Sequence, residues 1–578
     1  MYDFRKWTAA AACMMALGAC GGGGSGGEDS AAADDGRWLT FTPSPVVASV
    51  QRGQNIIIVA RSSRTLTETV NVAIEDDAAL FDPAATTVLA RDPLTYEASL
   101  RVAANASAGK HEGKLTVRLC RDNPAICAQP FAGSPWQVPY SIDVTAPTAV
   151  RKLLFSETGV AFTATPRASR LEHVITVRDN QSGITGWRAS ADQSWLQVTS
   201  TGQTDAQGNA RLTLHADPSA LQADSLNLAQ VTLIPDDPAV VAPERLVVGL
   251  WKGSGHLEQV QQLTNQAAID MAAIADPAKP YVYVATPQGV DVFHTHLATR
   301  QRTLVQFASM PSQMAISDDG ARLYVALTSG SLEMVDTTTG NIVRSLRNPS
   351  AYSGPMAYIR PNGVGMLVLG GRTVLRADTG EVLQSALPTN GYLSTSASAS
   401  RDGSRLILTG APGEVPQIWR TAYSESDPSR LQVQLIGGGA GATPPAYAAT
   451  WRTWDVALSA DGQWLAAVAD PQNTGTEPRC MLWDLRSGMA LLGNLSENFA
   501  RFVTVGVDGR VHCETQDSAG TQDLRLSSYA TDGSLLASQA LNYTPTPTNL
   551  LGPLHSSGDG LVQVKVGLGM VLFAPTPP

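Results

Sequence analysis

The sequence SQMAISDDGARLYVA, at residues 312–326, holds two short apolar runs joined by a tight turn. Asp319 and Gly320 form that turn, and Asp-Gly is a strong hairpin signal because both residues tolerate a positive φ angle. The flanking runs have the length and composition of β-strands. The stretch therefore predicts a β-hairpin.

The same pattern recurs through residues 256–578. Copies of the turn lie at Asp276, Asp319, Asn362, Asp402, Asp461, Asp508 and Asp559, which are 40 to 59 residues apart. A period of about 40–50 residues is the length of one four-stranded sheet, and such repeats close into a ring. The seventh copy lacks an outer strand. We expect residues 256–263 to supply it, because pairing the two ends of the repeat region protects its exposed edges.

The strands beyond the turn also have a characteristic form. Leu323-Tyr324-Val325-Ala326 makes the second strand, and a turn from Asp336 to Gly340 joins the third strand to the fourth. These features resemble YVTN-type β-propeller repeats. The resemblance spans residues 256–578 and implies a seven-bladed β-propeller.

Two further modules precede this region, at residues 37–146 and 147–253. Both show short alternating strands separated by turn residues at intervals of about 8–12 residues, which is the spacing of a β-sandwich. The first module resembles immunoglobulin-like domains, and no closer family is assigned to it. The predicted fold class is all-β, with two β-sandwich modules followed by a C-terminal seven-bladed β-propeller.

The second module carries Trp195-Leu196-Gln197-Val198 followed by Gly202. This pattern resembles the BACON family of bacterial immunoglobulin-like modules, which implies carbohydrate or mucin binding and supplies no catalytic residue. We expect Trp195 in the core, since an alternating strand buries its large apolar side chains. The place of Trp187 is left open.

The amino terminus reads as an export signal. Arg5 and Lys6 precede a short apolar run that ends at Ala19, too short to span a membrane. Cys20 follows Leu-Gly-Ala and resembles the lipobox of bacterial lipoproteins, which implies that residues 1–19 are removed and Cys20 is acylated. The alternative is an ordinary cleaved signal with an incidental cysteine.

Residues 20–36 then form a flexible Gly/Ser linker. Gly21, rather than Asp, follows the cysteine, which resembles outer-membrane sorting in Gram-negative lipoproteins. The expected location is therefore exported and lipid-anchored, at the outer membrane or cell surface rather than the inner membrane.

Four cysteines lie beyond the leader. Cys120 and Cys127 flank a short polar loop, and in an exported protein this favours a disulfide over two free thiols. Cys480 and Cys513 either bridge neighbouring blades or serve as small buried apolar residues. The sequence does not choose between these two.

Charge and motifs exclude several functions. The net charge of −10 argues against a nucleic-acid partner, because phosphate binding needs a basic surface. Motifs for a nucleophile elbow, a phosphate loop or a zinc protease are absent, so no cofactor and no catalytic residue is assigned. His294 and His296 share a strand face, but no third ligand lies nearby in sequence. We expect a solvated strand end there rather than a metal site.

The longest insertions between predicted strands are expected at the end of the ring opposite the Asp-Gly turns. Function on such scaffolds usually resides in loops. Side chains suited to stack on and hydrogen-bond a sugar ring or peptide are the candidates: Tyr447, Trp451, Arg452, Trp454, Asp470 and Arg479. The alternative is that Trp451 and Trp454 only pack between blades.

These features together favour a membrane-anchored envelope protein that binds a glycan, peptide or partner protein without catalysis. Two alternatives stay open. One is a hydrolase or lyase with its site in the central funnel of the propeller. The other is a scaffold for envelope assembly.

Overall fold

The computed structural model describes residues 37–577 apart from 53, 67, 69, 84–85, 104–105, 123–126, 146–149, 167, 244, 265–272, 348–353, 371, 388–395, 410–416, 438–451, 471–477, 487–489, 497–498, 517–523, 543–550 and 568. The leader, Cys20 and the linker lie outside these residues. Within them the named elements are β-strands, apart from one short 3₁₀ turn, η2 (Pro361–Gly363). The predicted all-β class is therefore confirmed. The chain divides into two compact units, which meet in sequence between Ala149 and Val150.

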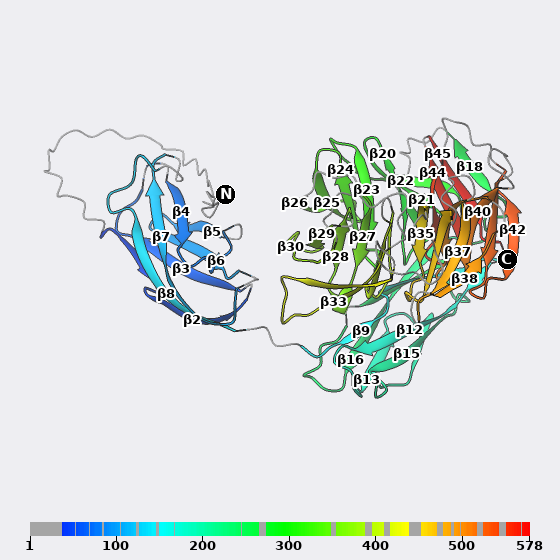
Figure 1. Ribbon diagram of the computed structural model, residues 1–578, viewed down its shortest axis with the longest axis horizontal. Helices are drawn as coiled ribbons and strands as arrows, with labels where there is room; N and C mark the ends of the chain where they lie inside the picture. Colours follow the sequence, from blue (N-terminus) through cyan, green and yellow to red (C-terminus); the bar gives the residue numbers. More distant parts are fainter. Residues whose placement is uncertain are drawn as a thin grey trace. The chain divides into compact units, whose positions relative to one another are not determined.

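The first module consists of two sheets around one core (Figure 1). Their strand orders are β1(Leu39–Thr42)-β3(Asn55–Ser62)-β6(Thr95–Arg101)-β5(Thr87–Asp92) and β2(Val46–Gln51)-β8(Trp136–Thr145)-β7(Gly109–Cys120)-β4(Asn71–Asp76). Strand β3 alternates exposed and buried residues, and its Ile56 and Ile58 point into the core. This alternation is the pattern of a sheet with one buried face.

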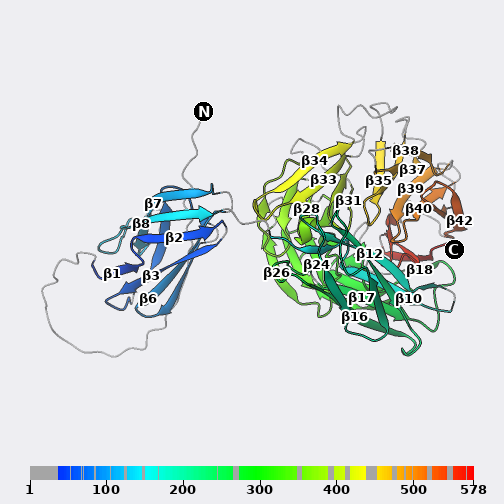
Figure 2. The same cartoon turned by 90° about the horizontal axis from the view of Figure 1, so that it is seen from below.

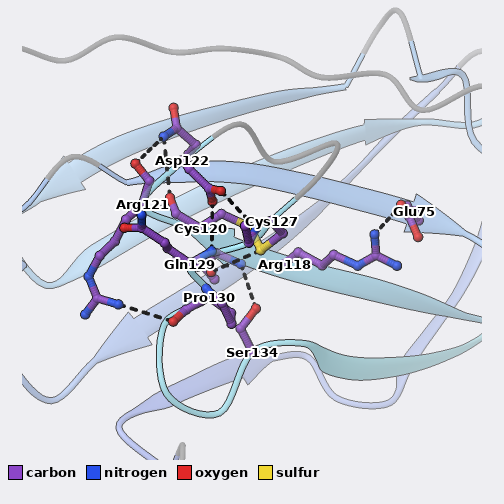
Figure 3. The surroundings of a disulfide bond; sticks show 12 residues. Glu75, Arg118, Cys120, Arg121, Asp122, Cys127, Gln129, Pro130 and Ser134 are labelled. Atoms are coloured by element: carbon purple, nitrogen blue, oxygen red, sulfur yellow. Dashed lines mark hydrogen bonds and ion pairs between the residues drawn. A yellow bond between two sulfur atoms is a disulfide. The ribbon is translucent and has the colours of Figure 1, made fainter.

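A disulfide closes the end of this module (Figure 3). Cys120, the last residue of β7, bonds Cys127, and their Cα atoms are 5.3 Å apart. The carboxylate of Asp122 accepts hydrogen bonds from the backbone amides of Ala128 (2.9 Å) and Gln129 (3.2 Å). The chain at Cys127 to Gln129 is thus held by the disulfide and by hydrogen bonds from its backbone amides to the Asp122 carboxylate.

The second module has two sheets of its own. They run β11(Ser169–Arg170)-β10(Gly159–Ala164)-β17(Leu246–Lys252)-β16(Ser225–Pro235)-β13(Trp187–Ala191) and β14(Leu196–Ser200)-β15(Asn209–Ala216)-β12(Glu172–Asp179)-β9(Leu153–Phe155). Trp187 and Trp195 both lie in the core between them, at 2% and 7% exposure. Trp195 is a core residue, as expected, and Trp187 joins it.

The remaining strands form four-stranded antiparallel sheets that we number in chain order. Sheet 1 is β19(Ala273–Ala275)-β20(Tyr281–Thr286)-β21(Gly289–His294)-β22(Thr299–Gln306), sheet 2 is β23(Pro311–Ile316)-β24(Arg322–Leu327)-β25(Ser331–Asp336)-β26(Ile342–Arg347), sheet 3 is β27(Met356–Ile359)-β28(Met366–Leu369)-β29(Thr373–Arg376)-β30(Val382–Leu383), sheet 4 is β31(Ala397–Ala399)-β32(Arg405–Leu408)-β33(Gln417–Tyr423)-β34(Leu431–Gly437), sheet 5 is β35(Arg452–Leu458)-β36(Trp464–Asp470)-β37(Arg479–Asp484)-β38(Ala490–Asn494), sheet 6 is β39(Phe499–Val505)-β40(Val511–Gln516)-β41(Leu524–Tyr529)-β42(Leu535–Ala540), and sheet 7 is β43(Leu551–Ser556)-β44(Val562–Gly567)-β45(Met570–Pro575)-β18(Gln261–Thr264).

The first strands of these sheets contact one another in cyclic order, from β19 through β43 and back to β19. We call this assembly the ring. Strand β18 comes from the start of the ring and pairs with β45, where Gln261 faces Phe573 and Thr264 faces Met570. The pairing starts at Gln261 rather than at residue 256, since Leu257 is instead buried against the cores of sheets 7 and 1. The two ends of the ring are thereby joined by backbone hydrogen bonds.

The Asp-Gly turns connect the first and second strands, so they all lie at one end of the ring, the Asp-Gly end. In sheet 2, Asp319 accepts hydrogen bonds from the Ser317 hydroxyl (2.5 Å) and from the Ala321 amide (3.0 Å). Gly320 adopts φ 69°, a conformation that favours glycine. The same Ser-x-Asp-Gly arrangement recurs in sheets 4, 5 and 7, at Ser400–Gly403, Ser459–Gly462 and Ser557–Gly560. The strands' opposite ends, where the insertions attach, form the loop end.

Candidate functional site

Four of the six predicted ligand contacts lie on strands of sheet 5: Arg452, Trp454, Asp470 and Arg479. Tyr447 and Trp451 lie outside the described residues. Arg452 begins β35 and pairs in register with Asp470, the last residue of β36. Arg479 begins β37, opposite Ala469, and is half-buried. The backbone therefore brings the positions of Arg452, Asp470 and Arg479 together at neighbouring strand ends of one sheet.

Trp454 lies on the same strand at an irregularity. The pairing of β35 with β36 shifts between Thr453 and Asp455, which leaves Trp454 outside the regular ladder. Bulges of this kind change the direction of a strand's side chains and occur often beside functional sites. A similar shift occurs in β39, around Arg501.

Deeper along β35, a buried carboxylate joins neighbouring sheets. Asp455 is 5% exposed and accepts hydrogen bonds from the amides of Val456 and Val503, each at 3.0 Å. The Ser396 hydroxyl adds a longer contact of 3.4 Å. Burial raises the pKa of Asp455 to about 7, despite these hydrogen bonds. Nothing in the sequence pattern pointed to this residue.

A buried ion pair joins sheets 6 and 7. Lys565 of β44 donates to Glu514 of β40, and the two side chains are 1% and 0% exposed. The Lys565 ammonium also lies 4.3 Å from the centre of the Phe502 ring. Arg501 Nε is 4.0 Å from Glu514. Burial lowers the pKa of Lys565, and the charge of Glu514 opposes this effect. The Lys565 ammonium therefore depends on Glu514 to stay charged.

The Asp-Gly end carries a different set of charges, because the second module packs against it (Figure 2). The amide and hydroxyl of Thr158 donate to Asp318 at 2.6 and 3.1 Å. Arg360 donates to the Phe155 carbonyl oxygen at 2.9 Å. There is no room for a side chain at Gly159, where a Cβ would lie 2.3 Å from the Asp318 carbonyl oxygen. The module and the ring therefore meet in a close-packed polar contact.

Glu157 of the second module is the central anion of this contact. It is 6% exposed, and Arg401 Nη1 donates to it at 2.6 Å and to the Gly159 carbonyl oxygen at 2.9 Å. His173 lies 2.5 Å from its other oxygen. Burial alone would raise the pKa of Glu157, but the hydrogen bond with His173 and the charge of Arg401 lower it to about 2.

His294 and His296 also belong to this contact, so the expectation of a solvated strand end is wrong. Both are 3% exposed. His296 Nε2 lies 2.6 Å from Asp559, which also accepts a hydrogen bond from the Thr163 hydroxyl of the second module. The His294 ring packs against Trp251, 4.3 Å between centroids, and burial lowers its pKa to about 3. The second module therefore covers this strand end.

The described residues contain one group of three possible metal ligands, Cys120, Asp122 and Cys127. Its two sulfur atoms are bonded to each other. A second disulfide joins Cys480 of β37 to Cys513 of β40, with Cα atoms 6.3 Å apart. Of the two possibilities for this pair, the structure has the bridge between neighbouring sheets.

On the axis of the ring, at the Asp-Gly end, lies a cavity of about 320 Å³. Residues from all seven sheets line it, chiefly the last residues of the first strands and their turns. Most of its polar groups are hydroxyls, including those of Ser317, Tyr358, Ser398 and Thr504. His555 also lines it, and burial, together with the charge of Lys565, lowers the pKa of His555 to about 4. The cavity wall is thus polar and carries a neutral imidazole.

Sequence reasoning missed Asp318, Arg401 and Glu157, although the repeats held a signal for the first two. The residue between Ser and Asp in the turn is charged in sheets 2 and 4, as Asp318 and Arg401. In sheets 5 and 7 the same position is Ala460 and Gly558. A charge at two copies of an otherwise small position indicates a contact that the other copies do not make.

Comparisons with known proteins add a fold neighbour. No protein-family model and no curated protein matches the chain. Among solved structures, the β-propeller domain of Cps50 (Swd1) from Myceliophteria thermophila matches with a TM-score of 0.40 and 14% identity, covering 55% of this chain and 100% of that domain. Within the described part of this chain, no helix has the length and apolar character needed to cross a membrane.

Proposed function

We propose that the ring is a seven-bladed β-propeller of the YVTN type, preceded by an immunoglobulin-like and a BACON-like β-sandwich. The repeat period, the cyclic contacts of the first strands and the pairing of β18 with β45 support this assignment. In the second module, the core positions of Trp187 and Trp195 suit a β-sandwich.

We further propose that the chain is an envelope lipoprotein, acylated at Cys20 and attached to the outer membrane or cell surface. The leader, the lipobox-like sequence and the Gly-rich linker support it. Two disulfides fit this location, because disulfides persist in oxidising compartments. In cells fed a radiolabelled fatty acid, the parent protein should carry the label and a Cys20→Ser variant should not. Equal labelling of the two proteins would remove the lipid anchor from the account.

The proposed activity is binding of a glycan, peptide or partner protein at the loop end, without catalysis. One observation carries this choice of end: the polar contacts between the second module and the ring lie at the Asp-Gly turns. The strand ends at which Arg452, Asp470 and Arg479 meet belong to the opposite end of the ring. That end also carries the long insertions, which are the usual place for recognition residues on a rigid scaffold.

A glycan array and a panel of envelope proteins, probed with the chain from Gly21 onward, test this proposal. We expect a ligand whose binding is weakened about tenfold or more by Trp451→Ala or Trp454→Ala, equivalent to about 1.4 kcal/mol. Trp464→Ala is the matched control, since Trp464 lies in the same sheet next to the Asp-Gly turn. If the Trp451 and Trp454 variants bind every ligand as well as the parent does, the site is elsewhere.

A hydrolase or lyase with its site in the central funnel is the second candidate, and the axial cavity is the observation that favours it. Arg401, Asp318 and His555 are among the residues that line it. Turnover in a panel of ester, lactone and glycoside substrates, lost on His555→Ala, would favour this candidate over simple binding.

A further inference from the structure

The axial cavity has the size of a small-molecule site. Its volume of about 320 Å³ lies at the lower end of the range for ligand pockets, about 300–1,000 Å³. Its wall comes from the inner strands of a closed ring, which fixes the spacing of its polar groups. Preformed spacing reduces the entropy that binding costs.

The charged residues in the wall are already paired within the protein. Asp276 accepts hydrogen bonds from Lys279 Nζ (3.1 Å) and the Tyr283 hydroxyl (2.8 Å). Asp318 is held by Thr158, and Arg401 by Glu157. A charged ligand would therefore meet no uncompensated countercharge, and its desolvation would be costly.

Two neutral polar groups in the wall are unused. Among the described residues, neither the Thr504 hydroxyl nor the His555 ring makes a hydrogen bond to protein. A neutral imidazole offers one donor and one acceptor, and a hydroxyl offers both. This pairing of donors and acceptors is complementary to the hydroxyls of a sugar or polyol.

We propose that the axial cavity is a binding site for an uncharged polyhydroxyl molecule of monosaccharide size, with Thr504 and His555 as its hydrogen-bonding contacts. The site is separate from the proposed loop-end site. It lies at the opposite end of the ring and uses none of the same residues. The ring would then carry two recognition sites on one axis.

Isothermal titration calorimetry with the chain from Gly21 onward tests this proposal, with glucose, galactose, mannose and N-acetylglucosamine as probes. We expect at least one sugar to bind the parent. The nearly isosteric Thr504→Val should weaken that binding about tenfold. His555→Phe, which also fills space, should abolish it. Thr531→Val, in a turn of the outer part of sheet 6, is the matched control and should bind like the parent.

Thermal unfolding of each variant shows whether the fold is kept, and Thr504→Val remains informative if His555→Phe does not fold. The proposal is overturned if none of the four sugars binds the parent. It is equally overturned if Thr504→Val binds with parental affinity. Loss of array binding in the Trp451 or Trp454 variants, with calorimetry unchanged, would concern the loop end alone.

Discussion

At the Asp-Gly end of the ring, buried carboxylates join the second module to the sheets, whereas toward the loop end of sheets 5 to 7 the buried charges join the sheets to one another. Glu157, Asp318 and Asp559 each bond a residue across the module boundary. Asp455 and the Glu514–Lys565 pair bond adjacent sheets. The first arrangement attaches the second module to one end of the ring. The second arrangement ties together sheets 5, 6 and 7, and the loop end of sheet 5 carries the proposed ligand contacts.

The largest effect is expected from removing Arg401. Arg401→Ala takes away the cation that donates to Glu157 and lies 3.8 Å from Asp318. Leaving buried carboxylates without this partner should lower the free energy of unfolding by about 3–5 kcal/mol, measured by urea denaturation. Arg486→Ala, which removes an exposed pair with Asp484, should have no measurable effect. Equal effects of the two substitutions would contradict a buried contact between the second module and the ring at the Asp-Gly end.

The disulfide between sheets 5 and 6 should come next. Cys480 and Cys513 are separated by 33 residues, and replacing both with Ser should cost about 3–4 kcal/mol through loop-closure entropy. Cys120 and Cys127 close only 7 residues, so the same replacement there should cost about 2 kcal/mol. Denaturant midpoints of the two double variants give the order. A smaller loss for the Cys480–Cys513 pair would remove it as a clamp between sheets.

The two buried regions should respond to pH in opposite directions. Asp455 has its pKa raised from 3.8 to about 7 by burial. Its contribution to folding is therefore present below pH 4 and is lost as pH rises through 7, by about 4 kcal/mol in all. In the Asp455→Asn variant the free energy of unfolding should change little between pH 5 and pH 8, whereas in the parent it should fall over this range. An unchanged pH profile in this variant would show that Asp455 is ionised in the folded protein already at pH 5.

Glu157 has the opposite sign, and its expected effect is smaller than that of Asp455. Its pKa is lowered from 4.5 to about 2, so its contribution is present above pH 4.5 and is lost as pH falls toward 2. The loss is about 3 kcal/mol. Glu157→Gln should weaken the protein at pH 7 and remove part of its acid sensitivity. An acid transition that is the same in variant and parent would argue against this role.

The Asp-Gly dipeptides made the repeat region predictable, because the turn they form depends on local backbone preferences alone. Gly320 has a positive φ angle because the turn itself requires it, independently of the rest of the fold. Trp195 was predictable for a similar reason, since strand alternation determines which side chains are buried.

The burial of His294 and His296 was not predictable, because it depends on segments far away in sequence. Thr163 and Asp559, which complete their surroundings, are 396 residues apart. Asp455 was missed for the same reason: its partners Ser396 and Val503 come from two other sheets. Of the candidate ligand contacts, the pattern predicted a shared position for Arg452, Asp470 and Arg479, and the strand register brings these three together.

The account rests on the second module and the ring forming one body at the Asp-Gly end. A double-mutant cycle on Glu157→Gln and Arg401→Met, read out as the free energy of unfolding, tests this contact most directly. We predict a coupling energy of about 2 kcal/mol between the two residues. Additive effects, within about 0.5 kcal/mol, would mean that the two side chains do not meet in solution and would contradict the contact between the second module and the ring.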